Sequence, residues 1–122
     1  MSMIANLVVA LVALLHLYFL LLEMYFWEKP LGLRTFAIKP EFAKATRSLA
    51  ANQGLYNGFL AAGLVWGLIL GSEGYSIKIF FLACVIVAGV FGAATANRKI
   101  LYIQALPAII AMILIWITGS GN

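Results

Sequence analysis

The stretch SLAANQGLYNGFLAAGLVWGLILGS occupies residues 48–72 and contains no charged side chain in 25 positions. A helix needs about 20 apolar residues to cross the hydrocarbon core of a bilayer, so this stretch is long enough to span it. Three further runs without charge lie on either side of it, at residues 1–22, 79–97 and 100–122. The pattern predicts an all-α fold, an integral membrane bundle of four transmembrane helices.

The composition of the 122-residue chain points to the same class. Hydrophobic residues make up 65% and charged residues 10%, against about 45–50% and about 25% in soluble domains. These values exclude a soluble enzyme and a nucleic-acid binder, and the single cysteine, Cys84, excludes an intramolecular disulfide. The expected partner is the lipid bilayer, because the basic residues lie beside the apolar runs and there face anionic headgroups.

We expect one domain over residues 1–122, with helices at about 3–27, 41–71, 77–96 and 100–118. Pro30 and Pro40 work against a continuous helix between the first two spans, and Pro107 is expected to kink the last one. The amphipathic start of the second helix is expected to lie at the membrane interface.

Basic residues predict the orientation of the spans. Seven of the eight lie in or beside the connections between helices one and two and between helices three and four, and the exception is Lys78. Cytoplasmic loops carry the excess of Lys and Arg, so both basic connections are expected in the cytoplasm and both termini outside. The chain is therefore expected to be a multi-pass protein of the plasma membrane, with Lys78 at the outer surface.

Small residues recur every four positions on the second and third helices. The glycines expected to allow close helix packing are Gly54, Gly58, Gly63, Gly67 and Gly92. On the second helix they form two stripes that point in roughly opposite directions, since five residues at about 100° each separate them. Packing within the bundle is the main interpretation, and a homo-oligomer through one of the stripes is the alternative.

The polar side chains at membrane depth gather in the half of the bundle that is expected to face the cytoplasm. The set comprises His16, Glu23, Asn52, Gln53, Tyr56, Asn57 and Gln104. We expect these residues to line a polar pocket that opens to the cytoplasm and binds or transports a small amphipathic or lipid-like ligand. Hydrogen bonding that only holds helices together is the alternative for each of them.

His16 and Glu23 are the candidates for metal binding or for an acid–base pair. They are seven residues apart, about 10 Å along one helix, which is too far for both to bind one ion without a bridging water. Glu23 alternatively pairs with Lys29 or Arg47. The sequence identifies no nucleophile motif and no cofactor, so it favours a role other than catalysis. An intramembrane enzyme using His16 and Glu23 and a structural or accessory subunit are the alternatives.

Several of these residues fall in one spaced pattern. The pattern comprises His16-x-x-Phe19-x-x-x-Glu23-x-x-x-Trp27, Pro30-x-Gly32, LAANQGLYNGFLAAGL (49–64), Cys84, Thr95 and Gln104-x-x-Pro107. It resembles the small bacterial membrane family catalogued as domain of unknown function 1304, over almost the whole chain. The resemblance implies four transmembrane helices and no established activity.

Overall fold

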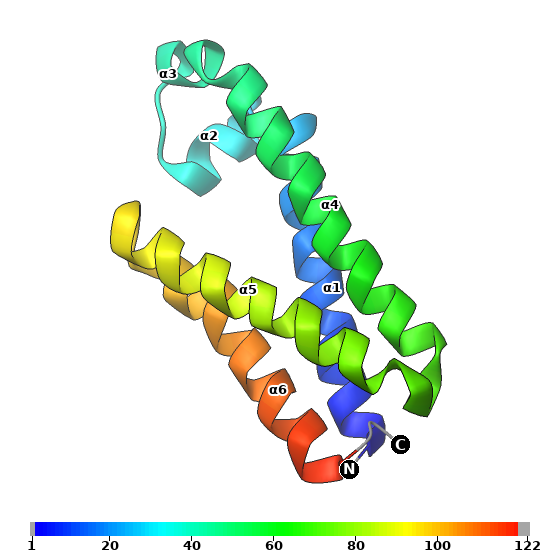
Figure 1. Cartoon of the computed structure of the whole chain (residues 1–122). Coiled ribbons are helices and arrows are strands. Elements are labelled where there is room, and N and C mark those ends of the chain that lie inside the picture. The colour runs from blue at the N-terminus through cyan, green and yellow to red at the C-terminus, as the bar shows by residue number, and fades with distance from the viewer. Residues whose placement is uncertain (1, 120–122) are drawn as a thin grey trace. The chain divides into compact units, whose positions relative to one another are not determined.

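The computed structural model describes residues 2–119, which are helical almost throughout (Figure 1). The elements are α1 (Ser2–Met24), α2 (Pro30–Phe36), α3 (Pro40–Ala45), α4 (Arg47–Ile69), the 3₁₀-helix η1 (Gly71–Gly74), α5 (Tyr75–Thr95), the π-helical turn η2 (Leu101–Ala105) and α6 (Leu106–Thr118). The all-α prediction is confirmed.

Three of the described helical segments are long and apolar enough to cross a membrane: Ser2–Met24, Gly71–Thr95 and Leu101–Thr118. The 23 residues of α4 are also long enough, but Asn and Gln in its first half leave it less apolar. These three segments indicate a multi-pass membrane protein. That α4 also crosses the membrane remains a prediction.

The chain forms two compact units, and α1 and α4 contribute to both. The bundle unit contains residues up to Leu14 and from Leu60 onward, and the loop unit contains Leu15–Phe59.

In the bundle unit, segments of α1, α4, α5 and α6 share one apolar core. The buried members are Ala5, Val9, Val12, Ala13, Leu64, Leu82, Val85, Ala108, Ala111 and Ile115. Many of them are small, whereas larger side chains such as Leu7, Leu11 and Ile113 are exposed. Small interior side chains let helices approach closely where the surrounding lipid is as apolar as the core.

Glycines provide the closest approaches in this unit. A Cβ on Gly74 would lie 1.9 Å from the carbonyl oxygen of Gly67, so the backbones of η1 and α4 are in direct contact. The other close neighbours are Phe81 for Gly63, Lys78 for Gly67, Ala105 for Gly89 and Ile100 for Gly92. In the loop unit, Gly54 and Gly58 pack on α1 at Leu20, Glu23 and Met24. All five glycines singled out from the sequence thus have close neighbours in their own chain.

Each proline lies in the first turn of a helix. No continuous helix joins α1 to α4, as expected: Pro30 opens the short α2, and Pro40 opens α3 one residue earlier than expected. Proline suits the first helical turn because the N–H that it lacks has no partner there in any case. Pro107 likewise lies in the first turn of α6, directly after the wider η2 turn, in which the Leu106 N–H bonds to the Leu101 carbonyl.

The first two expected helices differ most from the structure, whereas the third is α5 and the fourth consists of η2 and α6. The helix expected over 3–27 ends at Met24, and the helix expected over 41–71 is divided at Thr46 into α3 and α4. The Thr46 hydroxyl donates a hydrogen bond to the Phe42 carbonyl at 2.7 Å and accepts one from Trp27 at 3.2 Å. A threonine side chain that bonds to the backbone of the preceding turn competes with regular helix geometry, which accounts for the division.

Candidate functional site

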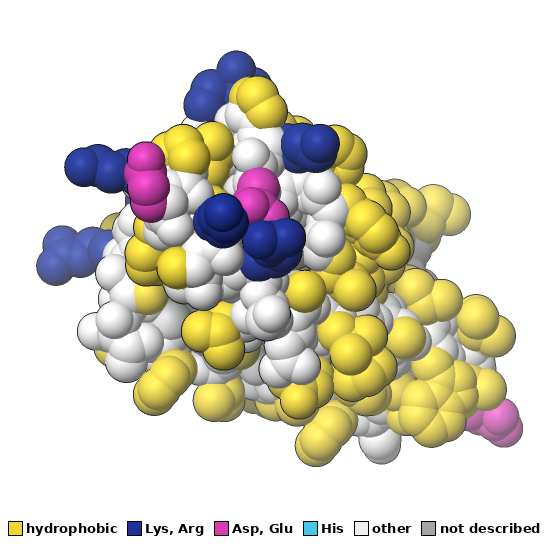
Figure 2. Space-filling model, turned by 90° about the horizontal axis from the view of Figure 1, so that it is seen from above, with side chains coloured by type: hydrophobic (Ala, Val, Ile, Leu, Met, Phe, Trp, Pro, Cys, Tyr) yellow, Lys and Arg dark blue, Asp and Glu magenta, His cyan; other side chains and the backbone are white. Residues whose placement is uncertain are grey.

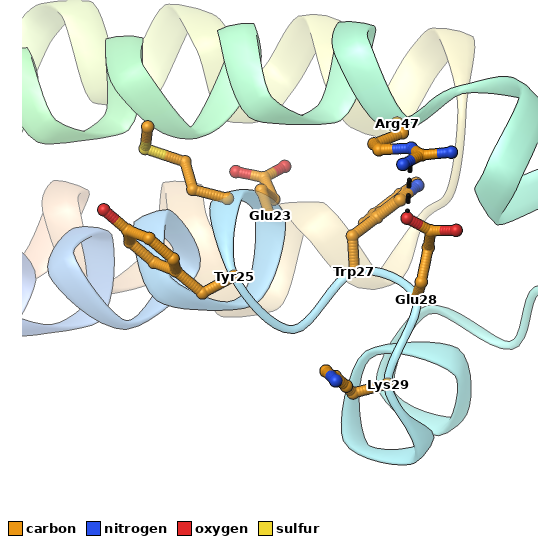
Figure 3. A pocket seen from close by; sticks show the side chains of 7 residues that line it. Glu23, Tyr25, Trp27, Glu28, Lys29 and Arg47 are labelled. Carbon is orange, nitrogen blue, oxygen red and sulfur yellow. Dashed lines mark ion pairs between the residues drawn. The ribbon is translucent and has the colours of Figure 1, made fainter.

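The loop unit contains a cavity of about 330 Å³ where α1 ends and α4 begins (Figure 3). Its lining consists of Glu23, Met24, Tyr25, Trp27, Glu28, Lys29 and Arg47. The lining therefore combines two carboxylates, two cations and two aromatic rings at the end of an apolar helix.

Glu23 is held in place by α4. The Asn57 side-chain amide donates a hydrogen bond of 2.5 Å to Glu23 Oε1, and Asn57 itself is buried. Gly54 lies against the Glu23 and Met24 side chains, so the absence of a side chain at Gly54 lets α4 come close enough for this bond. A carboxylate that accepts a hydrogen bond from a buried amide has a fixed orientation, and its second oxygen remains available to other donors.

Arg47 pairs with Glu28, so the alternative that it pairs with Glu23 was wrong. Its Nε lies 3.1 Å from Glu28 Oε1, and the two side chains are 59% and 39% exposed. An ion pair with this exposure contributes little to stability because water screens it. The ion pair places a cation and an anion side by side on the cavity wall (Figure 3).

Trp27 links the end of α1 to α3 through hydrogen bonds. Its indole Nε1 donates to the Ala43 carbonyl at 3.1 Å and to Thr46 Oγ1 at 3.2 Å. Its ring also lies 5.0 Å from that of Phe36 on α2. The sequence singled out Trp27 only as a member of the spaced pattern, because its hydrogen-bond partners lie 16 and 19 positions away.

The structure does not gather all of the expected pocket residues. Asn52 and Gln53 are exposed, and Tyr56 is 52% exposed with its ring 5.7 Å from that of Phe59. Of the seven, Glu23 and Asn57 are brought together in the loop unit, while Gln104 belongs to the η2 turn of the bundle unit.

His16 is completely buried, and its ring meets that of Phe19 edge-on at 5.4 Å. Within residues 2–119 there is no group of three or more His, Cys, Asp or Glu side chains placed to hold one metal ion.

Lys78 was expected at the outer surface, and that expectation was wrong. The side chain is fully buried in the bundle unit, and its Nζ donates a hydrogen bond of 3.0 Å to Asn6 Oδ1. Gly67 makes room for the lysine stem, because a Cβ there would lie 2.6 Å from Lys78 Cγ. The signal in the sequence was Asn6, the single amide in the first apolar run, residues 1–22.

Comparison with known proteins places the chain in a family. A family profile described as "Protein of unknown function (DUF1304)" matches residues 10–116. The uncharacterized protein YpaA of Lactococcus lactis subsp. lactis (strain IL1403) is 32% identical over 105 residues, which cover 84% of this chain and 88% of YpaA. No solved structure matches. The resemblance read from the motifs is confirmed, and the chain belongs to the DUF1304 family.

Proposed function

We propose that α4 is the fourth membrane span, that the loop unit faces the cytoplasm and that both termini lie outside, in the plasma membrane. Support comes from the exposed basic residues on and beside α2 and α3, which are Lys29, Arg34, Lys39, Lys44 and Arg47. Figure 2 shows Lys and Arg side chains gathered on one part of the face that it draws. Burial of Lys78 strengthens the asymmetry, because it leaves the α4–α5 connection without an exposed cation.

Labelling of single cysteines in intact cells tests this topology. In a Cys84→Ser background, Thr35→Cys places an exposed thiol on α2 and Ser72→Cys places one on η1. A membrane-impermeant maleimide is expected to label Ser72→Cys in intact cells and Thr35→Cys only after permeabilisation. Labelling of both thiols from outside would show that α4 does not cross, and the reverse pattern would invert the orientation.

We further propose that the cavity of the loop unit binds the polar head of a small amphipathic, lipid-like ligand. The observation that carries this proposal is the mixed lining, with both signs of charge at the end of an apolar helix. Glu23 and Glu28 suit a cationic amine, and Lys29 and Arg47 suit a phosphate or carboxylate. Tyr25 and Trp27 add amphipathic rings of the kind that occupy the headgroup layer. A zwitterionic amphiphile therefore matches the lining best.

Thermal stabilisation of the detergent-purified protein by dihexanoyl phosphatidylethanolamine tests the proposed ligand class. The Glu23→Gln variant is expected to weaken binding about tenfold, which corresponds to about 1.4 kcal/mol. Glu41→Gln is the matched control, because Glu41 is exposed on α3 and does not line the cavity. Dihexanoyl phosphatidylglycerol, which has no amine, is expected to stabilise the protein less. Absence of stabilisation by the phosphatidylethanolamine, or an equal loss in both variants, would refute the proposal.

A further inference from the structure

α4 has a polar face on the side opposite the one that packs on α1. Asn52 and Tyr56 are exposed in the loop unit, about 160° around the helix from Gly54, which is buried against α1. Phe59 is exposed on the same side, and its ring lies 5.7 Å from that of Tyr56. Gln53, also exposed, borders this face. We refer to Asn52, Gln53, Tyr56 and Phe59 as the outer face of α4.

The outer face lies at a depth where exposed amides are costly. Arg47, exposed and ion-paired, marks the start of α4 at the interface. Asn52 is about 7.5 Å and Tyr56 about 13.5 Å further along the helix, at 1.5 Å per residue. This step rests on the proposed crossing by α4. In a span, a carboxamide that faces hydrocarbon has no water to bond with and therefore favours association with a polar partner.

We propose that a second copy of this chain docks on the outer face, so that two α4 helices meet in a homodimer. A carboxamide both donates and accepts hydrogen bonds, so Asn52 and Gln53 can satisfy the same residues of an identical partner across a two-fold axis. The charge-free run 48–72 means that two copies of this face do not repel each other. The Tyr56–Phe59 pair supplies apolar contact area beside the amides.

The glycines do not provide this interface. Gly54 and Gly58 are covered by α1 side chains, and Gly63 lies against the Phe81 ring. We therefore assign the contact between two copies to the amides on the other side of α4, in place of the glycine stripes.

Single-molecule photobleaching of the full chain in phosphatidylcholine vesicles, over a range of protein-to-lipid ratios, measures the dimer fraction. The wild type is expected to dimerise, and Asn52→Leu combined with Gln53→Leu is expected to weaken dimerisation at least tenfold. Asn52→Gln combined with Gln53→Asn keeps both amides and is expected to retain the dimer. A wild type that stays monomeric at every ratio, or a Leu variant that dimerises normally, would overturn the proposal.

Cross-linking locates the interface in native membranes. In a Cys84→Ser background, Phe59→Cys is expected to form a disulfide-linked dimer on oxidation, and the exposed Val87→Cys on α5 is not. Cross-linking at Val87 alone, or to a different protein at Phe59, would overturn the proposal. Stabilisation of the Leu variant by dihexanoyl phosphatidylethanolamine is expected to persist. The Glu23→Gln variant is expected to lose this stabilisation and still to form the dimer. Ligand binding and dimerisation would then be independent, so that either proposal can fail without the other.

Discussion

The bundle unit and the loop unit share α1 and α4, but different interactions stabilise the interior of each unit. The bundle unit buries small apolar side chains around backbone-to-backbone contacts, with one hydrogen-bonded lysine among them. The loop unit relies more on side-chain hydrogen bonds, from Trp27 to α3 and from Asn57 to Glu23. The bundle unit should therefore be sensitive to added volume at Gly74 and to loss of the acceptor for Lys78, and the loop unit to loss of the Trp27 donor.

The largest effect is expected from Gly74→Ala. Its Cβ would lie 1.9 Å from the Gly67 carbonyl oxygen, and no side-chain rotation relieves a contact with backbone. We expect a loss of about 3 kcal/mol in the free energy of unfolding, measured by SDS titration in mixed micelles. Gly71→Ala is the control: it meets no atom within 4 Å, so only its left-handed φ of 62° costs stability, by about 1 kcal/mol. Equal losses in the two variants would contradict the close contact.

A somewhat smaller loss is expected when the buried amine of the bundle unit loses its acceptor. Asn6→Leu removes the 3.0 Å hydrogen bond from Lys78 and should cost about 2–3 kcal/mol in the same titration. Lys78→Met keeps the stem without the amine, so the double variant should recover most of the loss. If Lys78→Met gives no recovery, packing at position 6 decides stability in place of the hydrogen bond.

The loop unit should respond to a smaller chemical change that adds no volume. Trp27→Phe keeps an aromatic ring beside Phe36 but removes the donor to Ala43 and Thr46. We expect a loss of about 1–2 kcal/mol, with faster hydrogen exchange in α3 and the first turn of α4. Trp66→Phe, at an exposed indole, is the control and should leave that exchange unchanged. Equal exchange in both variants would show that Trp27 does not fasten α3.

The smallest effect is expected at the exposed ion pair. Glu28→Gln should reduce the free energy of unfolding by less than about 1 kcal/mol, and the difference from wild type should shrink further in high salt. Glu73→Gln, an exposed glutamate on η1, is the matched control. A loss of several kcal/mol at Glu28 would show that the loop unit depends on charge pairing more than its exposure indicates.

Charge and hydropathy predicted the helical class and four membrane-length helices, of which three are confirmed, and the spaced motifs predicted the family. Neither predicted which side of each helix is buried. In α1 the buried Val9 and Val12 and the exposed Leu7 and Leu11 are all apolar. Lipid accepts apolar side chains as readily as a protein core does, so hydrophobic periodicity carries little information here and side-chain size carries more.

The candidate site was predicted in part. The Glu23–Asn57 contact joins two residues that the sequence had placed at one depth, whereas Asn52 and Gln53 share that depth but point elsewhere. Depth follows from distance along a helix, but rotation depends on Gly54 meeting α1, which is a tertiary contact. The burial of Lys78 likewise depends on the space left by Gly67.

The π-helical turn η2 has a consequence for how the length of this chain can vary. A π turn contains one residue more than an α turn, and α6 begins directly after η2. Deletion of one residue within Leu101–Ala105 would convert it to an ordinary turn, and α6 would still present Ala108, Ala111 and Ile115 to the core. A one-residue insertion or deletion elsewhere in a helix rotates everything beyond it by about 100°. Relatives that are one residue shorter can therefore lose that residue at η2 and keep the same core.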